Sequence, residues 1–164
     1  MNYHNITKAD MLNGAGVRVV LWVAGCSHHC PQCQNPETWD ANGGIPFDAS
    51  AFLEIFHELE QEWCDGLTLS GGDPLHPKNR DAVFGICSSV KEHFPNKTIW
   101  CYTGYEWDDI KNLPGIKNID VLIDGKFDIM KANINYPWAG STNQRVIDVH
   151  KSLSERSVIL YAST

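Results

Sequence analysis

Residues 17–33 read VRVVLWVAGCSHHCPQC and join two contrasting patterns. The first eight residues form a continuous run dominated by β-branched, apolar and aromatic side chains, which is typical of a strand buried on both faces. The run ends at Gly25, and three cysteines follow within eight residues: Cys26, Cys30 and Cys33. The sequence therefore predicts a buried strand with a cysteine-rich loop at its carboxyl end.

Strand and helix patterns alternate along the rest of the chain. Short apolar runs predict strands at 66–70, 98–102 and 120–124, with weaker strand patterns at 146–149 and 158–161. Apolar residues at helical spacing predict helices at about 48–63, at 79–94 and, more briefly, at 107–113. This alternation favours βα units and a mainly parallel sheet. We expect an α/β fold in which the βα units form a truncated, open partial (β/α) barrel, with residues 1–164 in a single domain.

Composition narrows the class of protein. The chain has 164 residues, of which 43% are hydrophobic and 20% charged, and these values argue against a disordered chain. It carries 13 basic and 20 acidic residues, a net charge of −7, which argues against nucleic acid or an anionic membrane as a partner. The longest apolar run, 19–26, is shorter than the roughly 20 residues that span a bilayer. We expect a soluble, cytoplasmic protein.

Polar or glycine-rich segments follow each of the four clearest strands. The cysteine loop follows the first strand, and the sequences GGDP (71–74), TGY (103–105) and GKF (125–127) follow the other three. Right-handed crossovers place the carboxyl ends of parallel strands at one edge of the sheet, where α/β proteins bind ligands. The sequence therefore predicts that all four segments contribute to one site.

The spacing Cys26-x3-Cys30-x2-Cys33 supplies three thiolates and no obvious fourth. A closed structural zinc site needs four ligands, whereas three thiolates suit a [4Fe–4S] cluster with one iron left open for another ligand. Alternatively, His28 or His29 completes a Cys3His zinc site. The remaining cysteines are isolated in the sequence and are expected to be small buried hydrophobic residues: Cys64, Cys87 and Cys101.

The combination of this cysteine spacing with the GGDP segment resembles the radical S-adenosylmethionine superfamily. The sequence NGAGVR (13–18) is similar to a signature of its glycyl-radical activating enzymes. Five further stretches resemble the branch of these enzymes that acts on anaerobic ribonucleoside-triphosphate reductase: residues 1–3, 71–77, 102–105, 124–127 and 140–145.

The resemblance implies a reaction and its partners. A reduced [4Fe–4S] cluster on Cys26, Cys30 and Cys33 would give one electron to the sulfonium of S-adenosylmethionine. The resulting 5′-deoxyadenosyl radical would take a hydrogen atom from a glycine in the catalytic subunit of the reductase. A flavodoxin-type protein is an expected electron donor. Activation of another glycyl-radical enzyme, or a non-catalytic Cys3His zinc-binding interaction module, is the alternative.

The resemblance also implies how S-adenosylmethionine is held, namely by residues at the strand ends: Gly71, Gly72, Asp73, Asp124, Lys126 and Arg145. The two glycines let the backbone approach the methionine moiety, and Asp73 is expected to accept from its ammonium group. Most of the superfamily has glutamate at this position, which is one methylene longer.

The remaining roles are shared among charged and aromatic residues. Lys126 is expected to pair with the methionine carboxylate, and Asp124 to hold a monovalent cation. Arg145 and Arg18 are further candidates for the carboxylate or the ribose. Tyr105 and Trp138 are candidates for cofactor or partner contact, or for the core. The sequence has Gln32 and Gln34 beside Cys33, where relatives often have an aromatic residue, so it assigns no residue to the adenine.

Overall fold

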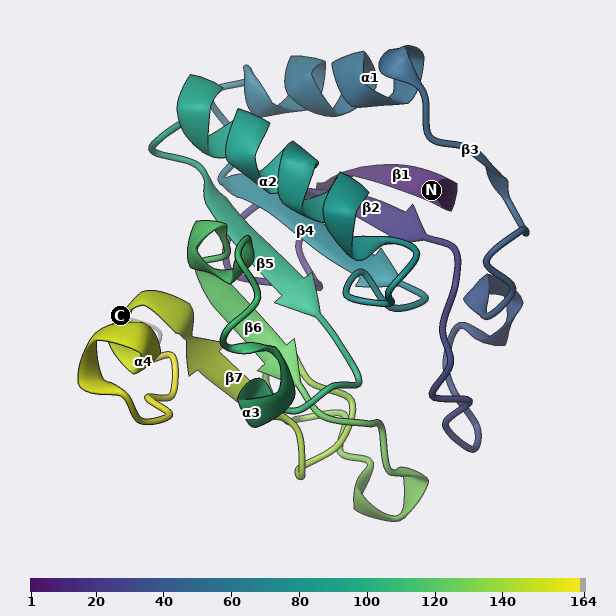
Figure 1. The fold of residues 1–164 in the computed structure, drawn as a ribbon, viewed down its shortest axis with the longest axis vertical. Coiled ribbons are helices and arrows are strands. Elements are labelled where there is room, and N and C mark those ends of the chain that lie inside the picture. Colours follow the sequence, from purple (N-terminus) through teal and green to yellow (C-terminus); the bar gives the residue numbers. More distant parts are fainter. Residues whose placement is uncertain (163–164) are drawn as a thin grey trace.

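Seven strands form one open sheet in the computed structural model, which describes residues 1–162 (Figure 1). The strand order across the sheet is β3-β1-β2-β4-β5-β6-β7. The four central strands are parallel, as predicted, whereas the pairings at the edges are antiparallel. The strands span β1 (Asn2–Asp10), β2 (Arg18–Val23), β3 (Ile45–Pro46), β4 (Gly66–Gly71), β5 (Thr98–Tyr102), β6 (Val121–Asp124) and β7 (Arg145–Asp148).

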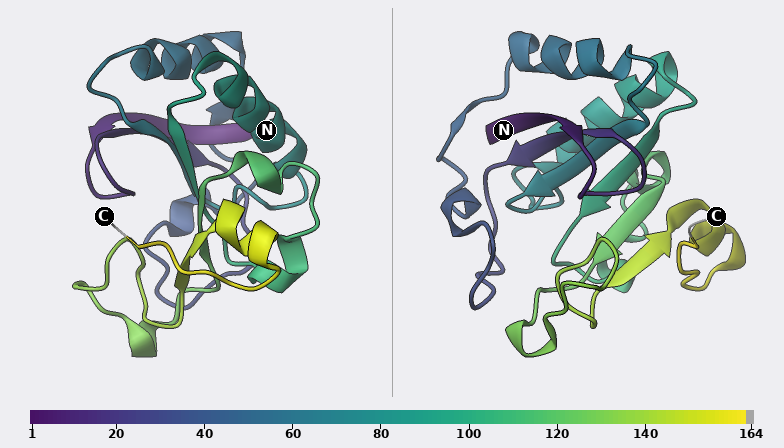
Figure 2. Two further views of the ribbon diagram at one scale, coloured as in Figure 1. Left: turned by 90° about the vertical axis from the view of Figure 1, so that its left-hand side faces the viewer. Right: turned by 180° about the vertical axis from the view of Figure 1, so that it is seen from behind.

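Two longer helices cover one face of this sheet, as the views in Figures 1 and 2 show. The helices are α1 (Ala49–Leu59), α2 (Arg80–His93), α3 (Trp107–Ile110) and α4 (Val149–Glu155), with 3-10 turns η1 (Pro36–Thr38), η2 (Ile116–Asn118) and η3 (Ile129–Lys131). Helix α1 begins after Asp48, whose side chain accepts a hydrogen bond from the Ala51 amide and so caps the first turn. Among residues 1–162, no helix combines the length and the apolar character needed to cross a membrane.

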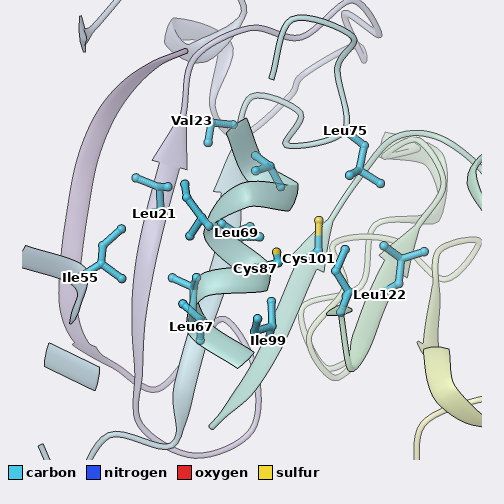
Figure 3. Close-up of a cluster of buried hydrophobic side chains, with 14 of the residues drawn as sticks. Leu21, Val23, Ile55, Leu67, Leu69, Leu75, Cys87, Ile99, Cys101 and Leu122 are labelled. Carbon is cyan, nitrogen blue, oxygen red and sulfur yellow. The ribbon is translucent and has the colours of Figure 1, made fainter. Parts of the chain in front are cut away.

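The main core lies between these helices and the sheet. Alternate residues of β2, β4 and β5 belong to this core, and Figure 3 shows the side chains of Leu67, Leu69 and Ile99 gathered near Cys87 of α2. The isolated cysteines Cys64, Cys87 and Cys101 belong to this core and are at most 1% exposed. Burial raises the pKa of Cys87 to about 12, so this thiol stays protonated at neutral pH. The prediction that these three are buried hydrophobic residues is confirmed.

The opposite face of the sheet carries a smaller aromatic cluster. Trp100 is buried and meets the rings of Trp138 and Tyr161 edge to face, with ring centroids 5.1 Å apart in both pairs. Trp138 is partly buried and packs against this cluster. Residues 158–161 make only an isolated bridge, Ile147 with Leu160, instead of the terminal strand expected there.

The buried Arg18 side chain links neighbouring strands at the amino ends of the central sheet. Its side chain is fully buried, and its guanidinium donates to the Thr68 hydroxyl (2.7 Å) and the Leu67 carbonyl (2.8 Å) on β4. It also donates to the carbonyl (2.7 Å) and hydroxyl (3.0 Å) of Thr98 on β5. Burial lowers the pKa of Arg18 to about 10, so the group remains charged at neutral pH.

This position corrects the expectation that Arg18 anchors a carboxylate or a ribose. Arg18 pairs with Gly66 at the start of β4, whereas the cysteine loop follows Val23 at the other end of β2. Val23 lies five residue steps along the strand from Arg18, which is about 17 Å at roughly 3.3 Å per step. The guanidinium therefore joins the strands together and does not reach the predicted site.

We predict that Arg18→Lys destabilises the protein by about 3 kcal/mol, because one ammonium cannot satisfy buried acceptors on both β4 and β5. Urea unfolding followed by circular dichroism measures this loss. Arg156→Lys is the matched control, since Arg156 is exposed, and it should change the free energy of unfolding by less than about 0.5 kcal/mol. Equal stability of the Arg18→Lys variant and the wild type would contradict this role.

Candidate functional site

The carboxyl ends of β2, β4, β5 and β6 meet around a cavity of about 200 Å³. In Figure 1 the dark-blue loop after β2 and the light-green loop after β6 extend from this same side of the sheet. The cavity wall includes all three cysteines of the loop, Gly71–Asp73 after β4, Thr103 and Gly104 after β5, and Gly125 after β6. The structure thus brings together the four segments that the sequence placed at one edge.

Backbone hydrogen bonds fix the start of the cysteine loop. The Gly25 amide donates to the Thr38 carbonyl (2.7 Å) and the Cys26 amide donates to the Trp39 carbonyl (3.0 Å). Cys26, Cys30 and Cys33 are partly exposed, with thiols that are not joined in disulfides. Burial raises the pKa values of the Cys26 and Cys30 thiols. The loop therefore presents three free thiols to one cavity.

The two histidines between the cysteines have other partners. Nε2 of His28 lies 2.7 Å from Oδ2 of Asp73, and the His29 ring packs edge to face on Trp39. Within residues 1–162, no three His, Cys, Asp or Glu side chains are gathered closely enough to hold a single metal ion. Three thiols on one wall fit a [4Fe–4S] cluster, because each thiolate then binds a separate iron.

Gly71 and Gly72 are required by close packing against the end of the neighbouring strand β2 and the start of the cysteine loop. Gly71 has φ +100°, and a Cβ at this position would lie 2.7 Å from the backbone nitrogen and oxygen of Val23. A Cβ at Gly72 would lie 2.6 Å from the Gly25 carbonyl oxygen. The absence of side chains allows the Gly72 and Asp73 amides to donate to Val23 (2.8 Å) and Gly25 (2.7 Å). The glycines therefore bring the end of β4 against the start of the cysteine loop.

Asp124 is buried at the end of β6 and is paired with Arg145. The guanidinium of Arg145 donates to both carboxylate oxygens, and the Trp107 amide donates to Oδ2 at 2.8 Å. Hydrogen bonding to Asp124 raises the pKa of Arg145. A monovalent cation from solution would have to share Asp124 with this guanidinium. Arg145 is still 39% exposed and faces a second cavity.

This second cavity, of about 790 Å³, adjoins the first, and the two share His28, Gly104 and Gly125 as lining residues. Its cationic lining residues are Lys126, Lys131 and Arg145, and its carboxylates include Glu106 and Asp109. Tyr105 also lines it and contacts the His28 ring at a centroid distance of 4.7 Å. The cavity therefore offers positive side chains to an anionic group of a ligand, beside the carboxylates of Glu106, Asp109 and Asp124.

Gln144 closes the loop between β6 and β7, a role that sequence analysis did not identify. Its side-chain oxygen accepts from the amides of Gly140 (3.0 Å) and Ser141 (3.1 Å), and its nitrogen donates to the Gly125 carbonyl (3.0 Å). The neighbouring Asn143 donates to the Lys126 carbonyl at 2.9 Å. The clamp joins both ends of the loop and so fixes Lys126 beside the cavities. The sequence signal that could have identified Gln144 is its place in the stretch 140–145, which resembles the family and directly precedes a predicted strand.

Comparison with known proteins identifies similar chains. Residues 12–147 match the family model of a 4Fe-4S single cluster domain. A protein of Enterobacteria phage T4 is 45% identical over 150 residues, covering 89% of this chain and 93% of that protein. A protein of Escherichia coli K12 is 39% identical (89% and 97% covered), and one of Pasteurella multocida is 40% identical (88% and 95% covered). All three carry the name anaerobic ribonucleoside-triphosphate reductase-activating protein.

We predict that Gln144→Leu, which keeps the side-chain size, releases the loop 125–143. Loss of the clamp should raise hydrogen exchange at the Gly140 and Ser141 amides about tenfold or more and cost about 2 kcal/mol of stability. Exchange measured by mass spectrometry tests the first effect and urea unfolding the second. Asn143→Ala, which removes one exposed hydrogen bond, is the control. Unchanged protection in Gln144→Leu would show that the clamp does not hold the loop.

Proposed function

The chain belongs to the family of anaerobic ribonucleoside-triphosphate reductase-activating proteins, with a 4Fe–4S single cluster domain, and we propose that it generates a glycyl radical on the catalytic subunit of such a reductase by reductive cleavage of S-adenosylmethionine. The observation that carries this proposal is the single cavity at the carboxyl edge, in which three free thiols face the glycine-rich segments after β4, β5 and β6. Three protein thiolates leave one coordination position of a four-iron cluster for the cofactor.

Cys26, Cys30 and Cys33 would hold the cluster, which would supply the electron for reductive cleavage of S-adenosylmethionine. The protein's own contribution is to bind, orient and shield the reactants. The backbone hydrogen bonds of Gly25 and Cys26 hold the start of the cysteine loop in place. Gly71 and Gly72 keep the adjoining wall free of side chains, so that the methionine moiety can approach the backbone.

Arg145 and Lys126 are suited to bind the methionine carboxylate. Arg145 keeps part of its guanidinium exposed in the larger cavity while Asp124 fixes its orientation. An arginine oriented in this way binds a carboxylate with less loss of side-chain entropy than a free one. Lys126, on the clamped loop, provides a second positive charge at the same cavity. If a monovalent cation takes part, it would share the Asp124 carboxylate with this guanidinium.

A protein substrate needs an open approach to the cofactor. The sheet does not close, and the larger cavity adjoins the cysteine cavity and opens to the surface. We propose that the open sheet acts as a partial barrel, that residues 1–164 work as one domain, and that the glycine-bearing segment of the reductase enters through this opening. Docking of the partner would exclude water from the radical. We further propose a flavodoxin-type electron donor and action in the cytoplasm.

Electron paramagnetic resonance provides the test. Anaerobically reconstituted protein, incubated with S-adenosylmethionine, dithionite and an anaerobic ribonucleoside-triphosphate reductase, should produce the doublet of a glycyl radical on the reductase. Cys30→Ala should lose both the cluster and the doublet, because a thiolate ligand is missing. Cys64→Ser is the control, since Cys64 lies away from the cavity and a hydroxyl can also donate to the Gly66 carbonyl. A chain with a full complement of iron and sulfide that yields no doublet would contradict the proposal.

A further inference from the structure

All acceptor positions of the Asp73 carboxylate are occupied by hydrogen-bond donors of the protein itself. The side chain is 1% exposed, and Oδ1 accepts from the Leu75 amide at 2.8 Å and from the Thr103 hydroxyl at 2.9 Å. Oδ2 accepts from the Gly104 amide at 3.0 Å and lies 2.7 Å from Nε2 of His28. An ionised carboxylate offers about four lone-pair positions, and these four donors fill them. A ligand's ammonium group would have to displace one of them.

His28 is the only one of these donors that belongs to the cysteine loop. Its side chain is 8% exposed, and because an ionised carboxylate can only accept, Nε2 must carry the hydrogen of this contact. The ring packs edge to face on Tyr105. A Cβ on Gly104 would lie 2.4 Å from Cδ2 of the ring, so glycine at this position is what admits the imidazole. The ring therefore has a preformed seat between the cysteine loop and the end of β5.

Asp73 consequently joins three segments that the sequence keeps far apart. His28 lies 45 residues before Asp73 and Thr103 lies 30 residues after it. We propose that Asp73 and His28 form a lock that positions the cysteine loop against the ends of β4 and β5, and that Asp73 is a positioning residue rather than the acceptor of the ammonium group. The short aspartate side chain suits this role, because it bonds within the wall of the cavity instead of reaching across it.

The lock deepens the proposed function and rests on it only in the identity of the cofactor that the positioned loop would serve. Its mechanical part concerns the chain itself. The loop that carries Cys26 and Cys30 is held at its start by backbone bonds to Thr38 and Trp39, and between these cysteines by the contact of His28 with Asp73. Loss of the lock would remove the second of these restraints.

Hydrogen exchange of the full-length chain without a cluster tests the mechanical part. His28→Leu removes the donor but keeps an apolar side chain, and exchange in residues 27–35 should rise about tenfold. His28→Gln, whose amide nitrogen can donate to Asp73, should restore most of the protection. His29→Leu is the matched control, because His29 is exposed and packs on Trp39 instead, and it should leave the protection largely unchanged. Equal exchange in His28→Leu and the wild type would overturn the lock.

Binding of S-adenosylmethionine to the reconstituted protein, measured by calorimetry, tests the role of Asp73. His28→Leu vacates one acceptor position on the carboxylate. If Asp73 acts by positioning, this variant should bind the cofactor about tenfold more weakly, and His28→Gln should rescue it. Equal or tighter binding by His28→Leu would overturn the proposal, since it would mean that the ammonium takes the vacated position. Failure of the wild type to bind S-adenosylmethionine would refute the proposed function, while the exchange experiment would still decide on the lock.

Discussion

The parallel alignment of β2, β4, β5 and β6 is the constraint on which the rest of the structure depends. Register pairs Arg18 with Gly66 at one end and Val23 with Gly71 at the other, so these neighbouring strands end together. The buried Arg18 guanidinium connects β2 to β4 and β5 at the amino ends. Because the strands cannot slide past each other without breaking these bonds, the loops that follow them meet at a fixed place.

The two faces and the edge of the sheet have different chemistry. One face packs on α1 and α2 with aliphatic side chains, and the other carries the aromatic cluster around Trp100. The carboxyl edge instead holds two buried carboxylates, Asp73 and Asp124, each satisfied by several protein donors. Buried charges of this kind are stable only with such partners, and here the partners come from different loops. The same bonds that stabilise the carboxylates therefore also arrange the cavity walls.

The segments with a periodic apolar pattern could be predicted from the sequence, whereas the strands toward the edges of the sheet could not. The central strands and both long helices lie within a few residues of their predicted positions, because continuous apolar runs and helical spacing are strong signals. Strand β1 was missed, since Ile6 is its only buried residue, and the chain turns back antiparallel at β7 instead of continuing as βα units. In the site, the parallel βα topology was enough to predict that the cysteine loop and the carboxyl ends of the strands lie together. The contacts of His28 with Asp73, and of Gln144 with Gly125, join residues distant in sequence, and no local pattern specifies them.

We propose that three cysteines at this edge hold a four-iron cluster whose remaining iron is free for S-adenosylmethionine. Mössbauer spectroscopy of protein reconstituted with ⁵⁷Fe, recorded with and without the cofactor, tests this proposal most directly. One iron in four should change its isomer shift and quadrupole splitting when S-adenosylmethionine is added, because that iron has no protein thiolate. Four irons that do not respond to the cofactor, or a single zinc ion in place of the cluster, would contradict it.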